Sequence, residues 1–309
     1  MAEKGGGIVI IQKTKPEECG GTDATLDTNA PKQIVSDKMV FFYATSALNS
    51  WGLPSETVNS RLGPLGLVSA FAAPSGEGTF LFLETSSGPR RYDNVKRSWA
   101  LVKKDVFPSL VALVDESDII KDNGYHSKTH GLPEDFGGSV KIVYESGEKI
   151  SFSNNQTPVF RYEFGRKVAE LFDEAMSGER VPLPDVSELS SIVYEENGSG
   201  GSFTKAHLTI GPDGKGINEK KTRYSDPHVY ESTKEVDAKT IEEIKEKIAE
   251  KGILAWAGLP KKEFTFGAQK KMTFVFGDGT KITVPGDRCL PDQISGGFFD
   301  IELEIVTKH

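Results

Sequence analysis

The stretch VKIVYESGEKISF, residues Val140–Phe152, has a counterpart late in the chain in MTFVFGDGTKITV, residues Met272–Val284. Both stretches are typical of β-hairpins, with apolar runs on either side of a polar turn that contains glycine. A Gly-Leu-Pro step precedes each of them, at Gly131–Pro133 and at Gly258–Pro260. The recurrence indicates a duplicated unit, which says much about architecture and little about chemistry.

The pairing register of these hairpins follows from their side chains. A three-residue loop, Glu145–Gly147, pairs Ile142 with Ile150 and gathers nearly every apolar side chain on one face. A two-residue turn would instead pair Val143 with Ile150 and mix lysine and serine into that face. The sequence therefore predicts the three-residue loop.

The second hairpin agrees with this register, because the same loop length pairs Phe274 with Ile282. In both copies the third loop residue is a glycine, Gly147 or Gly279. A type I turn followed by a bulge needs a left-handed backbone at that position, which glycine adopts without strain. We expect a positive φ at both glycines.

Length and composition describe a soluble globular protein with room for two domains. The chain has 309 residues, of which 37% are hydrophobic and 27% charged. No apolar run approaches the ~20 residues of a membrane span, so we expect no transmembrane segment. No export signal is visible, which predicts a cytoplasmic protein as written and an exported one if the N-terminus has been trimmed. The net charge of −8, without clustered lysine and arginine, argues against nucleic-acid binding.

The order of the expected elements predicts the domain organisation. Residues 1–33, rich in glycine, threonine, aspartate and proline, are expected to form a flexible N-terminal arm. Residues 34–184 and 185–309 are each expected to form an α+β repeat domain, and the proline-containing stretch 177–186 joins them. The predicted fold class is α+β, a tandem duplication in which each half is an antiparallel sheet with helices packed on one face.

Apolar spacing and terminal residues predict three helices, at Leu101–Lys121, Pro158–Met176 and Asp237–Gly252. The second helix has Thr157 as a candidate N-cap, and the third has capping-box spacing at Thr240 and Glu243. Strands are predicted at residues 35–48, 79–84, 190–195 and 204–210.

Two patterns conflict near the C-terminal end. Residues 298–306 alternate apolar with acidic side chains as a strand does, but helical spacing also fits Ile294, Phe298, Ile301 and Ile305. Gly296 and Gly297 oppose a helix by about 1 kcal/mol each. Because a helix follows the hairpin in the first half, we predict a helix from about Pro291 to Val306, frayed or kinked at the glycines.

The segment GLPEDFGGSVKIVYESGEKISFSNN, residues 131–155, resembles a segment of an uncharacterised family of bacterial proteins, common in gut anaerobes, that repeat a similar α+β unit. The family has no known activity, cofactor or catalytic residue. The resemblance therefore implies a repeated architecture and no function.

No motif for catalysis or cofactor binding stands out. His126 and His130 have the spacing of metal ligands on a helix, but the glycines that flank them favour a solvated loop. Cys19 and Cys289 lack metal-site spacing, and reduced thiols are expected. The glycine cluster at residues 198–201 joins two expected strands, so a hairpin turn is favoured over a phosphate cradle. We assign no catalytic, cofactor-binding or metal-binding residue and expect no cofactor.

Other candidate residues have plain structural interpretations. Glycosylation sequons begin at Asn155 and Asn197, but so short a pattern arises often by chance. Solvated surface positions are expected for the acidic pairs Asp115–Glu116, Glu242–Glu243 and Glu302–Glu304. Partly buried core positions are expected, ahead of a sugar-binding surface, for Trp51, Trp99 and Trp256.

Two functions remain open at this point. The absence of a nucleophile, metal or phosphate motif favours a non-catalytic binding or scaffolding protein that uses the groove between the two repeat domains. Its partner would be an unknown protein or a small molecule such as a carbohydrate. The alternative is a hydrolase of unrecognised type with a carboxylate-based site, which converging polar side chains in one pocket would favour.

Overall fold

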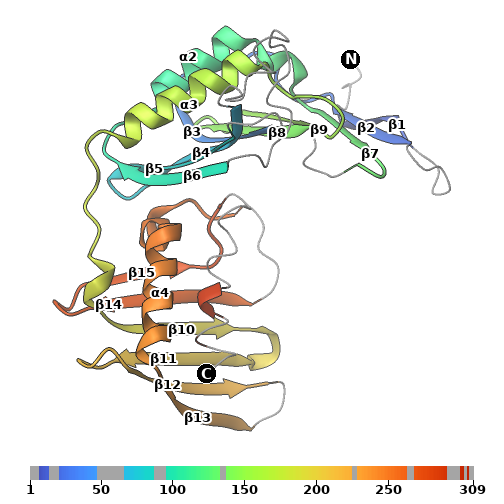
Figure 1. Ribbon diagram of the computed structural model, residues 1–309. Coiled ribbons are helices and arrows are strands. Elements are labelled where there is room, and N and C mark those ends of the chain that lie inside the picture. Colours follow the sequence, from blue (N-terminus) through green and yellow to red (C-terminus); the bar gives the residue numbers. More distant parts are fainter. Residues whose placement is uncertain are drawn as a thin grey trace. The chain divides into compact units, whose positions relative to one another are not determined.

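The computed structural model describes residues 7–13, 21–46, 66–86, 95–132, 137–224, 228–262, 268–290, 300–302 and 305. The chain divides into two units, the first comprising Met1–Pro74 and Gly78–Arg180 and the second Ser75–Glu77 and Val181–His309. A nine-stranded and a six-stranded sheet are combined with helices, so the fold class is α+β (Figure 1).

The nine-stranded sheet has the order β1-β2-β7-β9-β8-β3-β4-β5-β6. Its strands are β1 (Ile8–Gln12), β2 (Thr22–Asp27), β3 (Met39–Ser46), β4 (Gly66–Ser75), β5 (Gly78–Ser86), β6 (Val95–Val102), β7 (Tyr125–Thr129), β8 (Gly138–Tyr144) and β9 (Lys149–Asn154). The helices in the described part of this unit are α2 (Phe107–Ser117), the short 3-10 helix η1 (Ile119–Asp122) and α3 (Tyr162–Met176). An antiparallel sheet was predicted, but β7 pairs with β9 in parallel.

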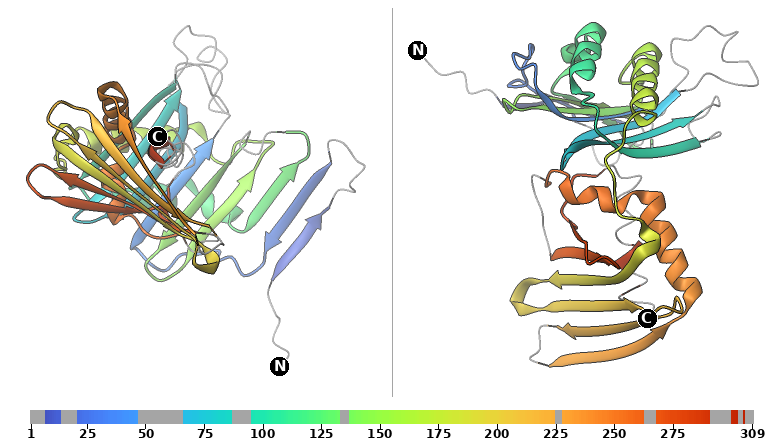
Figure 2. Two further views of the ribbon diagram at one scale, coloured as in Figure 1. Left: turned by 90° about the horizontal axis from the view of Figure 1, so that it is seen from below. Right: turned by 90° about the vertical axis from the view of Figure 1, so that its left-hand side faces the viewer.

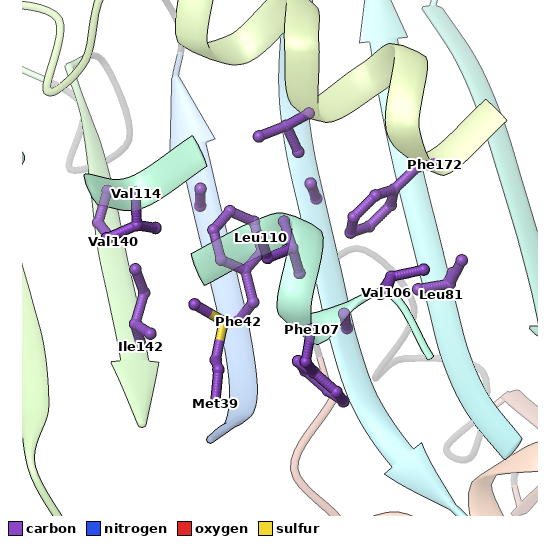
Figure 3. Packing of buried hydrophobic residues seen from close by; sticks show 14 of the residues in the cluster. Met39, Phe42, Leu81, Val106, Phe107, Leu110, Val114, Val140, Ile142 and Phe172 are labelled. Carbon is purple, nitrogen blue, oxygen red and sulfur yellow. The ribbon is translucent and has the colours of Figure 1, made fainter. Parts of the chain in front are cut away.

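The core of the first unit lies between the sheet and helices α2 and α3 (Figure 3). Alternate residues of the strands supply one side of it, among them Phe42, Leu81, Val140 and Ile142, and the helices supply Leu110, Val114 and Phe172. The Phe42 ring lies 6.3 Å from that of Phe172 and 6.5 Å from that of Phe164. Burial of each such side chain contributes about 1.5–3 kcal/mol, so this cluster holds the unit together.

Both hairpins have the register that their side chains predict. Ile142 pairs with Ile150 and Phe274 with Ile282. The loops close through hydrogen bonds of 3.0 Å, from the Tyr144 amide to the Glu148 carbonyl and from the Phe276 amide to the Thr280 carbonyl. The third loop glycine of each has a φ of 86°. The three-residue loop is therefore confirmed in both copies.

Residues 1–33 do not form the flexible arm that their composition suggested, as far as they are described. β1 and β2 are paired strands at one end of the nine-stranded sheet, where β2 also pairs with β7 (Figure 2). Ala24 of β2 is 3% exposed, whereas β1 is exposed along its whole length. Backbone pairing rather than side-chain burial holds β1 in the sheet. A search for segments with side chains to bury therefore did not predict this strand.

Two helix boundaries in the first unit differ from the prediction. Leu101 and Val102 complete strand β6, and the helix α2 begins only at Phe107. Helix α3 begins at Tyr162, because the Asn154 side chain accepts hydrogen bonds from the amides of Gln156 and Thr157 and holds that segment in a turn. Thr157 is therefore not the N-cap. Strand β4 was not predicted from the sequence.

The six-stranded sheet of the second unit has the order β13-β12-β11-β10-β14-β15. Its strands are β10 (Leu189–Asn197), β11 (Phe203–Ile210), β12 (Gly216–Arg223), β13 (Val229–Val236), β14 (Gln269–Phe276) and β15 (Lys281–Pro285). Its described helices include α4 (Ala238–Lys251) and the 3-10 segments η2 (Val186–Glu188), η3 (Ser199–Gly201) and η4 (Ile253–Gly258). Helix α4 crosses the strands of this sheet (Figure 1).

Helix α4 occupies the span that the sequence predicts, but its N-terminal cap is a different residue. The Asp237 side chain accepts a hydrogen bond of 2.8 Å from the Thr240 amide, which replaces the expected capping box. Gly252 ends the helix in a left-handed conformation. A side chain on Gly216 of β12 would meet both Leu208 of β11 and Ile241 of α4, so glycine lets helix and sheet approach closely.

The described part of the C-terminal segment is helical. Asp300–Glu302 are α-helical and Ile305 has π-helical geometry, and both Ile301 and Ile305 are buried. At these residues the helix is confirmed over the strand. The rest of the predicted span, including both glycines, lies outside the described residues.

Candidate ligand-binding site

A row of polar side chains crosses the inner face of the six-stranded sheet, the face that carries the buried residues Ile192, Tyr194, Leu208, Met272 and Phe274. The row runs through directly paired residues on five neighbouring strands, Lys270, Glu196, Thr204, Thr222 and Tyr230. Directly paired residues in an antiparallel sheet point to the same side. We call these five residues the polar row.

A pocket of about 570 Å³ opens at this end of the sheet. Its lining includes Glu196, Thr204 and Thr222 of the polar row, together with Ser202 and Tyr224. Its volume lies within the range of small-molecule sites. The sheet therefore ends in a hollow whose lining includes the hydroxyl groups of Ser202, Thr204, Thr222 and Tyr224.

The floor beside this pocket is a hydrogen-bonded cluster around Tyr194. The Tyr194 hydroxyl lies 3.0 Å from Glu196 Oε2 and 2.9 Å from Glu302 Oε1. Burial, followed by the hydrogen bond to Glu302, raises the pKa of this hydroxyl. The hydroxyl carries one hydrogen, so it donates to one carboxylate at a time.

Lys270 supplies the charge that lets the two carboxylates lie close together. Its Nζ is 2.7 Å from Glu302 Oε1 and 3.8 Å from Glu196 Oε1. All three side chains are only 15–26% exposed. Opposite charges at these distances offset part of the cost of removing each group from water.

The helical C-terminal segment docks on the same face. Glu302 reaches Tyr194 and Lys270, and the Asn218 side chain of β12 donates to the carbonyl of Ile305. Among the described residues, Glu302 Oε2 and Asn218 Oδ1 are buried without a hydrogen-bond partner. Polar contacts as well as the buried Ile301 and Ile305 thus place this segment.

The two charged residues that line the pocket already have contacts within the protein. Glu196 faces Lys270, as above, and the Arg223 guanidinium lies 5.2 Å from the centre of the Phe203 ring. Arg223 Nε also donates to the Gly201 carbonyl at 2.8 Å. The pocket therefore carries one negative and one positive group, each of them engaged.

An aromatic pair stands at the side of the pocket. The rings of Tyr224 and Tyr230 have their centres 5.8 Å apart at an interplanar angle of 57°. The two side chains are 62% and 52% exposed. Two large aromatic side chains are thus exposed to solvent beside the pocket.

No family model matches this chain. No curated protein matches it in sequence either. The site is therefore interpreted from its own geometry.

The histidines singled out by their spacing lie on and next to a strand rather than in a loop. His126 is in β7 and its Nδ1 is 2.9 Å from Ser153 Oγ of β9, while His130 Nε2 is 3.2 Å from Asp23 Oδ2. Burial lowers the pKa of His126, and the nearby Asp27 opposes that shift. Within the described ranges, no group of three or more His, Cys, Asp or Glu residues is arranged to hold a metal ion.

Other candidates are placed by ordinary structural roles. Asn155 is 2% exposed and its amide bonds the Thr129 backbone through both atoms, at 2.7 and 3.0 Å, so that sequon is inaccessible. Trp256 is fully buried, and Trp99 stacks on Phe80 at 6.1 Å. Trp51, Cys19 and Glu304 lie outside the described residues. No helix in the described ranges is long and apolar enough to span a membrane.

Most of this site was not predicted from the sequence. Glu302 was expected to be a solvated carboxylate, whereas its side chain is 15% exposed and bonded to Tyr194 and Lys270. Thr204 began an expected strand and Glu196 lay just beyond another, and neither had an assigned role. The available signal was polar residues at the inward positions of strands, such as Glu196 two residues after Tyr194, which breaks the expected apolar alternation.

A second, smaller pocket of about 240 Å³ lies between α2 and α3 of the first unit. Its charged lining includes Glu116 and Lys167, which are paired with each other at 2.6 Å. The charges of these two side chains therefore compensate each other inside the pocket. The pocket of the second unit is the stronger candidate because it is larger and its lining includes Thr222, whose buried hydroxyl has no hydrogen-bond partner among the described residues.

Proposed function

We propose that this protein is a non-catalytic binding or scaffolding protein and that its ligand occupies the pocket at the end of the polar row. The proposal rests on the buried hydroxyl group of Thr222. This residue is 5% exposed, lines the pocket, and its hydroxyl has no hydrogen-bond partner among the described residues. A buried hydroxyl without a partner costs about 1–3 kcal/mol, which a bound polar molecule or water would recover.

The proposal concerns the second unit alone. The groove between two repeat domains, which the sequence suggested as the binding place, stays a prediction. What favours the pocket is the combination of hydroxyl side chains, an engaged carboxylate and exposed tyrosines within one sheet. Such a combination suits recognition through hydrogen bonds and ring contacts.

The test is a titration of the full chain, labelled at threonine methyl groups, with mixtures of small polar compounds of several chemical classes. We expect chemical-shift changes at Thr204 and Thr222, and none at Thr25 or Thr45, which lie in the first unit. Changes confined to threonines away from the pocket, or none for any compound, would contradict the proposed site.

We further propose that the fold arose by tandem duplication, with helices packed on one face of each sheet. The support is a shared order of elements. Strands β3 to β6, helix α2 and the hairpin β8–β9 correspond to strands β10 to β13, helix α4 and the hairpin β14–β15. In both sheets the hairpin joins the first strand of the four, giving the orders β9-β8-β3-β4-β5-β6 and β15-β14-β10-β11-β12-β13. Superposition of the two sheets should bring the hairpins into coincidence, and hairpins that fell on different strands would refute common descent.

A specific observation keeps the carboxylate-based hydrolase as a second candidate. Glu196 and Glu302 approach the same hydroxyl, that of Tyr194, and Glu196 lines the pocket. Paired carboxylates at a pocket are the groups that glycoside hydrolysis uses. If the protein released products from a polymeric substrate and Glu196→Gln abolished the release, catalysis would replace simple binding as its function.

A further inference from the structure

The charge of the pocket indicates what kind of molecule fits it. Glu196 and Arg223 are its charged lining residues, and their charges are opposite and held by Lys270 and by Phe203 with Gly201. An ionised ligand would have to displace one of these contacts, because a cation would compete with Lys270 for Glu196 and an anion would have to draw Arg223 away from Phe203 and Gly201. A neutral ligand avoids that cost.

The hydroxyl groups narrow the class further. Thr204, Thr222, Ser202 and Tyr224 each carry a group that both donates and accepts a hydrogen bond. A ligand with many hydroxyl groups of its own matches such a wall, because its groups can both donate and accept; Ser202 Oγ already donates to the Ser199 carbonyl and offers an acceptor. The Glu196 carboxylate adds acceptors for two further ligand hydroxyls.

The tyrosine pair adds an apolar contact of the right kind. The Tyr224 and Tyr230 rings are more than half exposed. Tyr224 directly follows β12, and Tyr230 lies in the edge strand β13. A sugar ring has an apolar C–H face and a polar rim, so it can lie on an aromatic ring while its hydroxyl groups reach the wall. Peptides and apolar metabolites would leave one of these two surfaces unused.

We infer that the pocket binds a neutral carbohydrate, with a sugar ring against Tyr224 and Tyr230 and its hydroxyl groups bonded to Thr204, Thr222 and Glu196. This inference rests on the proposed binding function and adds the ligand class. It assigns contact roles to Glu196, Thr204, Thr222 and Tyr230, which the polar row places side by side on β10 to β13, and to Tyr224, which follows β12.

The experiment titrates the full, methyl-labelled chain with cellohexaose, xylohexaose, maltohexaose and chitohexaose as neutral probes. A galacturonic-acid oligomer and a mixed tripeptide library serve as charged and non-carbohydrate probes. We expect at least one neutral oligosaccharide to shift the Thr204 and Thr222 methyl signals, and the charged oligomer to bind at least about tenfold more weakly.

Variants assign the contact to the tyrosines. Tyr224→Ala should weaken binding of that oligosaccharide by about tenfold, because it removes the ring surface, and Tyr230→Ala should weaken it less. Tyr162→Ala, in the first unit, is the matched control and should leave affinity unchanged. Because Tyr224 is 62% exposed, its replacement does not remove a core residue, and an unchanged methyl spectrum confirms the fold.

The outcomes separate the two proposals. If a tripeptide or the charged oligomer shifts the Thr204 and Thr222 methyl signals and no neutral oligosaccharide does, the inference of a neutral carbohydrate ligand is wrong. The proposed binding site then still stands. If no probe of any class shifts them, both fall. If an oligosaccharide binds but Tyr224→Ala and Tyr162→Ala behave alike, the tyrosine pair is not its platform and the inferred mode of recognition is overturned.

Discussion

The strand pair β3–β8 of the first sheet and the strand pair β10–β14 of the second begin with similar residues and end with different ones. Three successive inward pairs on β3 and β8 are Phe42–Ile142, Ala44–Val140 and Ser46–Gly138. The corresponding pairs on β10 and β14 are Ile192–Phe274, Tyr194–Met272 and Glu196–Lys270. The first of these pairs is apolar in both sheets. The last pair is small in the first sheet and charged in the second.

That change alters what the end of each sheet can do. A Cβ on Gly138 would lie 2.1 Å from the Thr45 carbonyl oxygen and 3.0 Å from Val159, so the first sheet is closed tightly there. In the second sheet the larger Glu196 and Lys270 form a polar cluster with Tyr194 and Glu302, and Glu196 also lines the pocket. One strand order thus supports a sealed end in one unit and a polar, accessible end in the other.

The largest effect is expected where the two sheets agree. Phe42→Ala removes a fully buried ring that contacts Phe164 and Phe172, and should lower the free energy of unfolding of the first unit by about 3–5 kcal/mol. Ile192→Ala should cost the second unit about 2–5 kcal/mol. Peptide-resolved hydrogen exchange reads each unit separately. Equal acceleration of β3–β8 and β10–β14 by Phe42→Ala alone would show that the units do not have separate cores.

Where the sheets differ, the charge of Lys270 should matter more than an exposed charge nearby. Lys270→Met leaves the two half-buried carboxylates of Glu196 and Glu302 without their cation and should cost the second unit about 1–3 kcal/mol. Lys271→Met is the matched control, because its contact of 2.7 Å with Glu195 lies on the outer face and is worth less than about 1 kcal/mol. Urea denaturation measures both. Adding Glu302→Gln to Lys270→Met should recover part of the loss, and no recovery would argue against the charge cluster as its cause.

The hairpin loops offer a comparison in which both units should respond alike. Gly147 and Gly279 share a φ of 86°, and an added Cβ at either would meet no atom within 4 Å. Replacement by valine therefore tests backbone strain alone and should cost about 1–2 kcal/mol in each unit. Thermal unfolding of the two variants should give equal shifts, and asparagine at the same positions a smaller shift. A difference between the two valine variants would mean that the loops are not equivalent.

The smallest effect concerns pH and belongs to the first unit. Burial lowers the pKa of His126, so the folded state binds a proton less readily than the unfolded state. The stability that follows is fully present above the unfolded pKa of about 6.5 and is lost as pH falls through it toward the folded pKa. His126→Gln should flatten the decline in protection of β7 and β9 between pH 7 and pH 5. The strands β10–β14 provide the internal control, and an unchanged slope at β7 would refute the assignment.

Sequence reasoning succeeded where a short segment contains its own signal. The hairpin register followed from Ile142, Ile150 and the loop glycines, and α4 followed from the spacing of Ile241, Ile244 and Ile248. These features depend on local periodicity and on a backbone conformation that few residues adopt.

It failed where pairing partners far along the chain determine the structure. β1 and β13 are exposed along nearly all their length, so side-chain burial gives no periodic signal in either. Leu101 was assigned to a helix because its apolar neighbours fit both periods, but pairing of β6 with β5 decides for a strand. The polar row was missed for the same reason. Glu196, Thr204 and Thr222 lie on three successive strands, and only the register of those strands makes them direct neighbours.

The place of β10 in its sheet has a consequence for synthesis on the ribosome. β10 to β13 form a meander of consecutive strands, which can pair as soon as they emerge, because each loop between them is short. The other edge of β10 belongs to β14, which is made only after α4 and η4. During that interval the nascent meander exposes an unpaired strand edge bearing Ile192 and Tyr194, the type of edge that invites pairing with another chain. Slower translation between residues 236 and 269 would lengthen the exposure, so aggregation of newly made chains should depend on the rate at which that segment is translated.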